Sequence, residues 1–245
     1  MYKEAARVRD FLIDLIYPPR CPYCGRVIAL GERTCGTCTA EPWRIAAPRC
    51  GHCGRNRREC TCSSGHAPKY YQGVAAPFYF GGTVRSAVYR LKRRCDPVRL
   101  LSEEMYRSLR ESYGDLEFDR ITCIPMSRRA RRARGFNQSR ELAVALARLT
   151  GIRFEELLVK HFDTQVQHSL TAEERRANVL GAYDVRGGAD PSGLRILLVD
   201  DVFTTGSTAI ECAKMLCFSG AQSVHILCAA ITLPEKREYR VDKRE

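Results

Sequence analysis

The segment ILLVDDVFTTGSTAIECAKML, from Ile196 to Leu216, decides the fold class. Four apolar residues lead into two aspartates, then into small hydroxylated residues around one glycine, and then into a helical pattern. This order predicts a buried strand over 195–199 and, after a turn, a helix over 207–218 that ends near Gly220. A strand, a short turn and a helix form one unit of a parallel sheet with helices on its faces.

Two further apolar runs have the length of strands. The run at 121–124 ends at Pro125 and is followed by a basic loop and by a helix from about Ser139. A third strand is expected at 224–231, directly after the helix at 207–218. The chain is therefore expected to be an α/β protein with four parts: an N-terminal helix in 1–19, a cysteine module in 20–62, a linker in 63–69 and the body in 70–245.

The net charge is the main signal in the composition. The chain has 245 residues and carries 40 Lys and Arg against 28 Asp and Glu, a net charge of +12. This excess favours a polyanionic partner, either nucleic acid or a phosphorylated small molecule. Charges interrupt the first seventeen residues, which argues against a signal peptide, and no apolar run is long enough to insert into a membrane. We expect a cytoplasmic protein, where clustered cysteines bind metal more often than they form disulfides.

Eight of the 13 cysteines fall before Ser63, in pairs of close spacing. CPYCG and CGHCG have the form of zinc knuckles, in which the glycine lets backbone amides turn toward the thiolates. Zinc prefers four thiolates, so one or two structural Zn²⁺ ions are expected on Cys21, Cys24, Cys35, Cys38, Cys50, Cys53, Cys60 and Cys62. Sequential use of the first four and the last four is favoured, and a cross-braced arrangement stays open. The last pair has a spacing of only one residue, so His52 and His66 are candidate substitutes.

The acidic pair Asp200 and Asp201 comes directly before a phosphate-binding pattern. Amides and hydroxyls between Thr204 and Thr208, at a helix N-terminus, suit a phosphate dianion. Carboxylates beside that loop suit hydroxyl groups or Mg²⁺, so a ribose 5-phosphate fits the pattern. No lysine follows Gly206 and no GxGxxG is present, which excludes the common nucleotide loops. The pattern resembles the fingerprint of type I phosphoribosyltransferases, whose ligand is 5-phosphoribosyl 1-diphosphate (PRPP).

Other stretches narrow the resemblance to the ComF family of competence proteins. They are RRARRARGFNQSRELA (128–143), DTQVQHSLTAEERRANVLGAY (163–183), YRLKRRCDP (89–97) and YPPRCPYCG (17–25). This chain departs from the family pattern at Tyr183, at the Cys60-x-Cys62 pair and after Lys92, where an aromatic residue is usual. The resemblance implies a type I phosphoribosyltransferase-like parallel sheet behind a double zinc ribbon.

The resemblance also assigns roles by position. It implies that Asp200, Asp201 and Arg175 are catalytic, and that Mg²⁺ binds together with PRPP. PRPP contacts are expected from Val202, Thr204, Thr205, Gly206, Ser207 and Thr208, and from Pro125, Met126 and Ser127 near the pyrophosphate. Contacts with pyrophosphate or DNA are expected from Lys92, Arg128, Arg129, Arg131, Arg132, Arg134, Asn137 and Gln138, and from Thr164, Gln167 and Asn178 in a mobile loop.

Two classes of function follow from these expectations. The first is a Mg²⁺-dependent phosphoribosyltransferase that displaces pyrophosphate from PRPP onto an unknown acceptor, in a protein linked to DNA uptake. The second is a non-catalytic protein that senses PRPP or binds single-stranded DNA, with the zinc ribbon as a docking module for competence proteins. The five arginines at 128–134 could hold pyrophosphate, bind DNA together with Phe136, or form a solvated loop.

Overall fold

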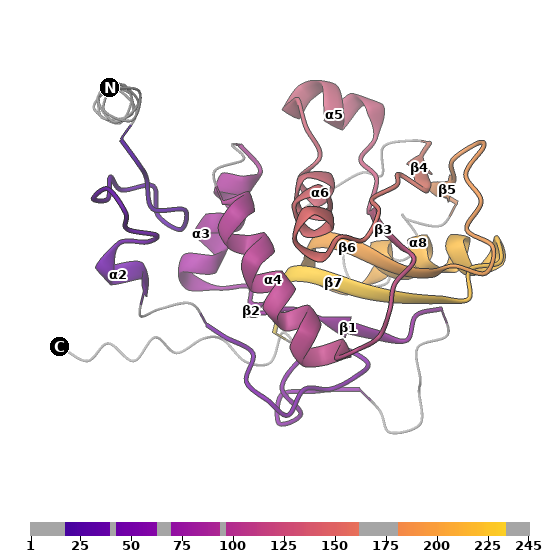
Figure 1. The fold of residues 1–245 in the computed structure, drawn as a ribbon, viewed down its shortest axis with the longest axis horizontal. Helices are drawn as coiled ribbons and strands as arrows, with labels where there is room; N and C mark the ends of the chain where they lie inside the picture. Colours follow the sequence, from indigo (N-terminus) through magenta and orange to yellow (C-terminus); the bar gives the residue numbers. More distant parts are fainter. Residues whose placement is uncertain (1–17, 40–42, 63–69, 94–96, 162–180, 234–245) are drawn as a thin grey trace, which may run out of the picture.

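The computed structural model describes residues 18–39, 43–62, 70–93, 97–161 and 181–233. Its centre is a parallel sheet in the order β1-β7-β6-β3, with β2 beside the distal part of β7 (Figure 1). The strands are β1 (Gly73–Ala75), β2 (Phe78–Tyr79), β3 (Arg120–Cys123), β6 (Arg195–Phe203) and β7 (Ser223–Ile231). The expected helix within 1–19 and the linker at 63–69 lie outside the described residues, apart from Pro18 and Pro19.

The central strand β6 explains why the acidic pair lies where it does. Ile196 to Val199 have no exposed surface, as expected of a parallel strand covered on both faces. The strand continues four residues beyond the predicted end, because it stays paired with β7 as far as Phe203 opposite Ile231. Asp200 and Asp201 therefore lie inside the strand, near its carboxyl end, and not after it.

Helices cover both faces of the sheet. One face packs against α4 (Val98–Tyr113) and α6 (Gln138–Thr150), and the other against α8 (Ser207–Phe218). Helix α3 (Gly82–Leu91) lies at the end of the sheet near β2. Helix α4 was not predicted, although Leu101, Met105 and Leu109 form a buried stripe at helical spacing. Two hydrophobic clusters, one on each face, form the core of the body.

The arginine run was expected to be a loop, and this expectation is wrong. Residues 128–134 form the short helix α5 (Arg128–Arg134), which stands away from the sheet and buries no side chain (Figure 1). Ser127 caps its N-terminus by accepting a 3.1 Å hydrogen bond from the Ala130 amide. Gly135 ends it in the left-handed conformation. Because caps and not an apolar face stabilise this helix, hydrophobic periodicity could not reveal it.

A small antiparallel hairpin lies beyond the β3 edge of the sheet. It pairs β4 (Leu158–Lys160) with β5 (Tyr183–Val185), and Phe154 just before it forms a bridge with Ile121 of β3. The chain between these two strands includes 162–180, which lies outside the described residues.

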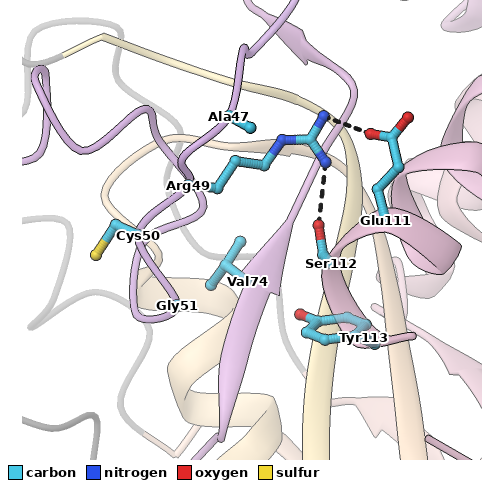
Figure 2. A pocket seen from close by; sticks show the side chains of 8 residues that line it. All are labelled: Ala47, Arg49, Cys50, Gly51, Val74, Glu111, Ser112 and Tyr113. Carbon is cyan, nitrogen blue, oxygen red and sulfur yellow. Dashed lines mark hydrogen bonds and ion pairs between the residues drawn. The ribbon is translucent and has the colours of Figure 1, made fainter. Parts of the chain in front are cut away.

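The cysteine module, with its short helix α2 (Gly36–Thr39), is fastened to α4 by ion pairs. Arg44 makes two hydrogen bonds to Glu104, at 2.7 and 3.1 Å. Arg49 reaches Glu111 at 2.8 Å and Ser112 at 3.1 Å, beside a cavity of about 280 Å³ at the junction (Figure 2). The module therefore has a defined position on the body.

Candidate functional site

The eight cysteines of the module form two groups of four. One group is Cys21, Cys24, Cys35 and Cys38, and the other is Cys50, Cys53, Cys60 and Cys62. Within each group the sulfur atoms lie within 4.8 Å of one another, and Cys24–Cys35 and Cys53–Cys60 are each 3.6 Å apart. Tetrahedral zinc with bonds of about 2.3 Å requires sulfur separations of about 3.8 Å, so both groups fit zinc. The grouping is sequential, and the second group is complete without His52.

The knuckle glycines have the conformation that the sequence predicts. Gly25 and Gly54 have φ angles of +81° and +72°. A Cβ at Gly25 would lie 2.2 Å from the Arg90 guanidinium, and one at Gly54 would lie 2.6 Å from the Val74 carbonyl oxygen. Both glycines are thus also points where the zinc module contacts the body closely.

The acidic pair at the end of β6 is held by hydrogen bonds from two elements. Ser139, near the N-terminus of α6, donates to Asp200 Oδ1 at 2.9 Å, and the Asp201 amide donates to the same oxygen at 2.8 Å. The Val202 amide donates to Asp201 Oδ1 at 2.8 Å. These contacts fix the orientation of both carboxylates before any ligand binds.

The electrostatics of the pair favour an added cation or hydroxyl donor. Burial, followed by the nearby charge of Asp201, raises the pKa of Asp200 to about 8. Lys92, at the end of α3, supplies one cation, with its Nζ 3.6 Å from Asp201 Oδ2. Lys92, which was expected to contact pyrophosphate or DNA, pairs with the second aspartate in this structure. A bound cation or hydroxyl donor would offset the repulsion between the two carboxylates.

The predicted phosphate loop follows directly. Gly206 has a φ of +77° and is the N-cap of α8, so the N-cap residue itself has no side chain to cap the helix. The Ser207 amide, the first of the helix, donates a long 3.4 Å hydrogen bond to Thr205 Oγ1. Thr205 and Ser207 hydroxyls are 2.8 Å apart. A Cβ at Gly206 would lie 2.4 Å from Phe203, because the ring packs under the turn. Only glycine fits this position on both counts.

The second predicted loop lies at the carboxyl end of β3. Pro125 and Met126 are half-buried, and buried Ser127 caps α5. Asn137 donates to the Ile124 carbonyl at 2.9 Å and caps α6 by accepting from the Ser139 amide at 3.1 Å. Gln138 is buried and accepts a 2.9 Å hydrogen bond from Arg134. The structure thus joins this loop to the acidic pair through the first turn of α6.

The remaining predicted residues divide into two sets. The α5 arginines are exposed, and only Arg134 has a hydrogen bond recorded among the described residues. Thr164, Gln167, Arg175, Asn178 and His66 lie outside the described residues. Sequence reasoning missed Ser139, although it lies within the matched segment at 128–143 and directly follows Asn137 and Gln138.

Comparison with known proteins shows what the chain is similar to along most of its length. Residues 12–67 match the family model described as a double zinc ribbon domain. The chain is 30% identical to DNA utilization protein YhgH of Salmonella typhimurium, over 89% of this chain and 100% of that protein. It is 25% identical to competence protein F of Haemophilus influenzae, over 84% of this chain and 94% of that protein.

Phosphoribosyltransferases are also among the matches. Amidophosphoribosyltransferase of Rattus norvegicus is 23% identical over the whole chain, which spans 52% of that enzyme. A solved adenine phosphoribosyltransferase matches 60% of this chain and 74% of its own, with 17% identity and a TM-score of 0.39. The double zinc ribbon and the parallel sheet confirm the predicted fold class. None of the described helices combines the length and apolarity that crossing a membrane requires.

Proposed function

Because the chain belongs to the ComF family, together with DNA utilization protein YhgH and competence protein F, we propose that it binds PRPP and transfers its phosphoribosyl group to an acceptor. The observation that supports this most directly is the continuity of the acidic pair with the α8 loop. Asp200 and Asp201 directly follow the four buried apolar residues of β6. Gly206, two residues after Thr204, is the N-cap of helix α8. One ligand with ribose hydroxyls and a 5-phosphate satisfies both parts.

Each part of the site has a distinct task in this proposal. The amides at the start of α8, with the Thr204 to Thr208 hydroxyls, bind the 5-phosphate dianion. Asp200 and Asp201 accept hydrogen bonds from the ribose hydroxyls. The same carboxylates would hold Mg²⁺, which would neutralise charge on the departing pyrophosphate. The carboxylate oxygens of the pair are ligands of the kind that such a cation prefers.

Lys92 and the loop at 125–127 would act on the leaving group. Lys92 pairs with Asp201 at 3.6 Å, so its ammonium group is close enough to move onto a diphosphate when the aspartate binds ligand. Pro125, Met126 and Ser127 lie at the carboxyl end of the neighbouring strand, where parallel sheets bind their ligands. Arg175, Thr164, Gln167 and Asn178 keep their proposed roles in closing the site.

Pyrophosphate release tests the catalytic proposal. PRPP and Mg²⁺ are incubated with the protein and a panel of acceptors, and pyrophosphate is measured. The Asp200→Asn/Asp201→Asn variant should lose release that depends on acceptor, while Asp115→Asn, a change at a side chain that is 98% exposed, should keep it. If calorimetry shows that PRPP binds but no acceptor in the panel leads to release of pyrophosphate, the protein is better described as a PRPP sensor. The absence of binding at millimolar PRPP would refute both the transferase and the sensor.

A second candidate function, binding of single-stranded DNA, has its own structural support. The names of the relatives refer to DNA use and competence, and α5 presents five arginines with no buried side chain. Guanidinium groups on such a helix suit phosphate backbones, and Phe136 follows as a stacking candidate. Binding of an oligonucleotide should weaken steeply with salt, with a shallower slope after α5 arginines are replaced by glutamine. A salt slope that does not change in that variant would remove this candidate.

A further inference from the structure

A cavity of about 420 Å³ lies between α5 and the β4–β5 hairpin. Pro125 and Met126 line it from the sheet edge, Arg128 and Arg131 from α5, and Lys160 and Arg186 from the hairpin side. This volume is in the range of pockets that hold small ligands. It lies beyond the edge strand β3, and none of the residues from Asp200 to Thr208 lines it. The cavity is therefore separate from the predicted ribose 5-phosphate loop.

The lining is strongly cationic. Four basic side chains and one carboxylate, Glu156, give it a net charge of +3. Glu156 already binds two guanidinium groups, with Arg140 at 3.1 Å and Arg186 at 2.6 Å. The carboxylate is therefore neutralised from inside the protein and adds little repulsion toward an anion.

The two α5 arginines are the groups most available to a ligand. Arg128 and Arg131 are three residues apart, so they lie on the same side of the helix. Both are exposed, and neither guanidinium group makes a hydrogen bond or ion pair within the part of the chain that the structure describes. Arg129 and Arg132 belong to the same helix but do not line the cavity. The sequence analysis gave all the α5 arginines the same candidate roles, whereas in the structure only some of them line the cavity.

We propose that this cavity is a second ligand site, which binds a small phosphate monoester at the same time as the ribose 5-phosphate loop is occupied. Two guanidinium groups from α5 bind the phosphate dianion from one side, and the hairpin supplies positive charge from the other. Asn137, which also lines the cavity, lies two residues before Ser139, the hydrogen-bond donor to Asp200. The site is thus adjacent to the acidic pair. The binding of a phosphate monoester in this cavity does not depend on the proposed function.

Calorimetric titration with phenyl phosphate tests the site. The titration is done with the wild-type chain and with Gly206→Ala, which disrupts the α8 loop, and phenol serves as the uncharged comparison. Phenyl phosphate should still bind and phenol should not. The Arg128→Gln/Arg131→Gln variant should bind about tenfold more weakly or worse, since two charge-assisted contacts are lost. Glutamine keeps the helix propensity of α5 close to that of arginine.

The matched control is Arg129→Gln/Arg132→Gln, which removes the same charge from the same helix. It should leave phenyl phosphate binding within about twofold, because these arginines act only through screened, long-range attraction. Equal weakening in both double variants would overturn the proposal, as would the absence of phenyl phosphate binding. Loss of binding when PRPP and Mg²⁺ are added would assign the cavity to the diphosphate of PRPP and also overturn it. Phenyl phosphate binding without any PRPP binding would refute the proposed function and leave this site standing.

Discussion

Ser139 Oγ donates a 2.9 Å hydrogen bond to Asp200 Oδ1, although 61 positions separate the two residues in sequence. The bond joins the first turn of α6 to the end of β6. Ser139 is only 5% exposed, and Asp200 is partly buried. The hydroxyl therefore sets the direction in which the first carboxylate of the pair faces, and Ser139 is a positioning residue for any ligand of Asp200.

The Ser139→Ala variant should bind PRPP about five- to tenfold more weakly, because loss of one hydrogen bond costs about 1 kcal/mol. Calorimetry in the presence of Mg²⁺ measures the change. Ser102→Ala is the matched control, since Ser102 is equally buried and its hydroxyl bonds only to the Arg99 carbonyl of its own helix. Similar affinities for Ser139→Ala and wild type would contradict the positioning role.

Gly206→Ala should disrupt the α8 loop. The new methyl group would meet the Phe203 ring, and the positive φ adds backbone strain, so stability should fall by about 2 kcal/mol and PRPP binding should be lost. Gly135→Ala separates the two causes. Gly135 has a φ of +85° but has nothing within 4 Å of the added Cβ, so only the strain of about 1 kcal/mol is expected. Equal losses of stability, from urea unfolding of both variants, would exclude the ring contact as a cause.

The sequence predicts the central strands well, because a parallel strand covered on both faces must be a continuous apolar run. The predicted strand ended at Val199, because two charged residues are unusual inside a buried strand. The structure keeps them in the strand because β7 pairs with β6 as far as Phe203 opposite Ile231. The prediction of the strand end therefore failed at the acidic pair, the residues that we propose bind the ligand.

Other features of the site depend on contacts between distant segments. The spacing of the cysteines favoured the sequential grouping but left a cross-braced one open. The positions of the sulfur atoms show which four cysteines belong to each group. The pairing of Lys92 with Asp201 and the division of the α5 arginines by the cavity follow from the packing of elements far apart in the chain. No local pattern encodes such contacts, because each partner is an ordinary surface residue in its own segment.

Zinc content tests the sequential grouping against cross-bracing. The wild-type chain should bind two zinc ions, measured by a colorimetric assay after denaturation. Cys24→Ser/Cys35→Ser changes two ligands of one group, so one zinc should remain. Cys24→Ser/Cys53→Ser changes one ligand in each group and should leave none. A cross-braced module would give the opposite results, and Cys217→Ser, remote from both groups, should keep two ions.

The pairing of Asp119 with Arg195 should make stability depend on pH in the acid range. Hydrogen bonds from the Arg195 side chain and amide lower the pKa of Asp119 to about 2. Because this folded-state pKa lies below the ordinary value of about 3.9, the pair stabilises the fold above pH 4, and the stabilisation is lost as pH falls toward 2. A double-mutant cycle with Asp119→Asn and Arg195→Gln, from urea unfolding, should give a coupling at pH 6 that declines at pH 2.5. The cycle cancels acid loss of zinc, which affects all four proteins alike. A coupling that is the same at both pH values would show that the Asp119 charge does not contribute.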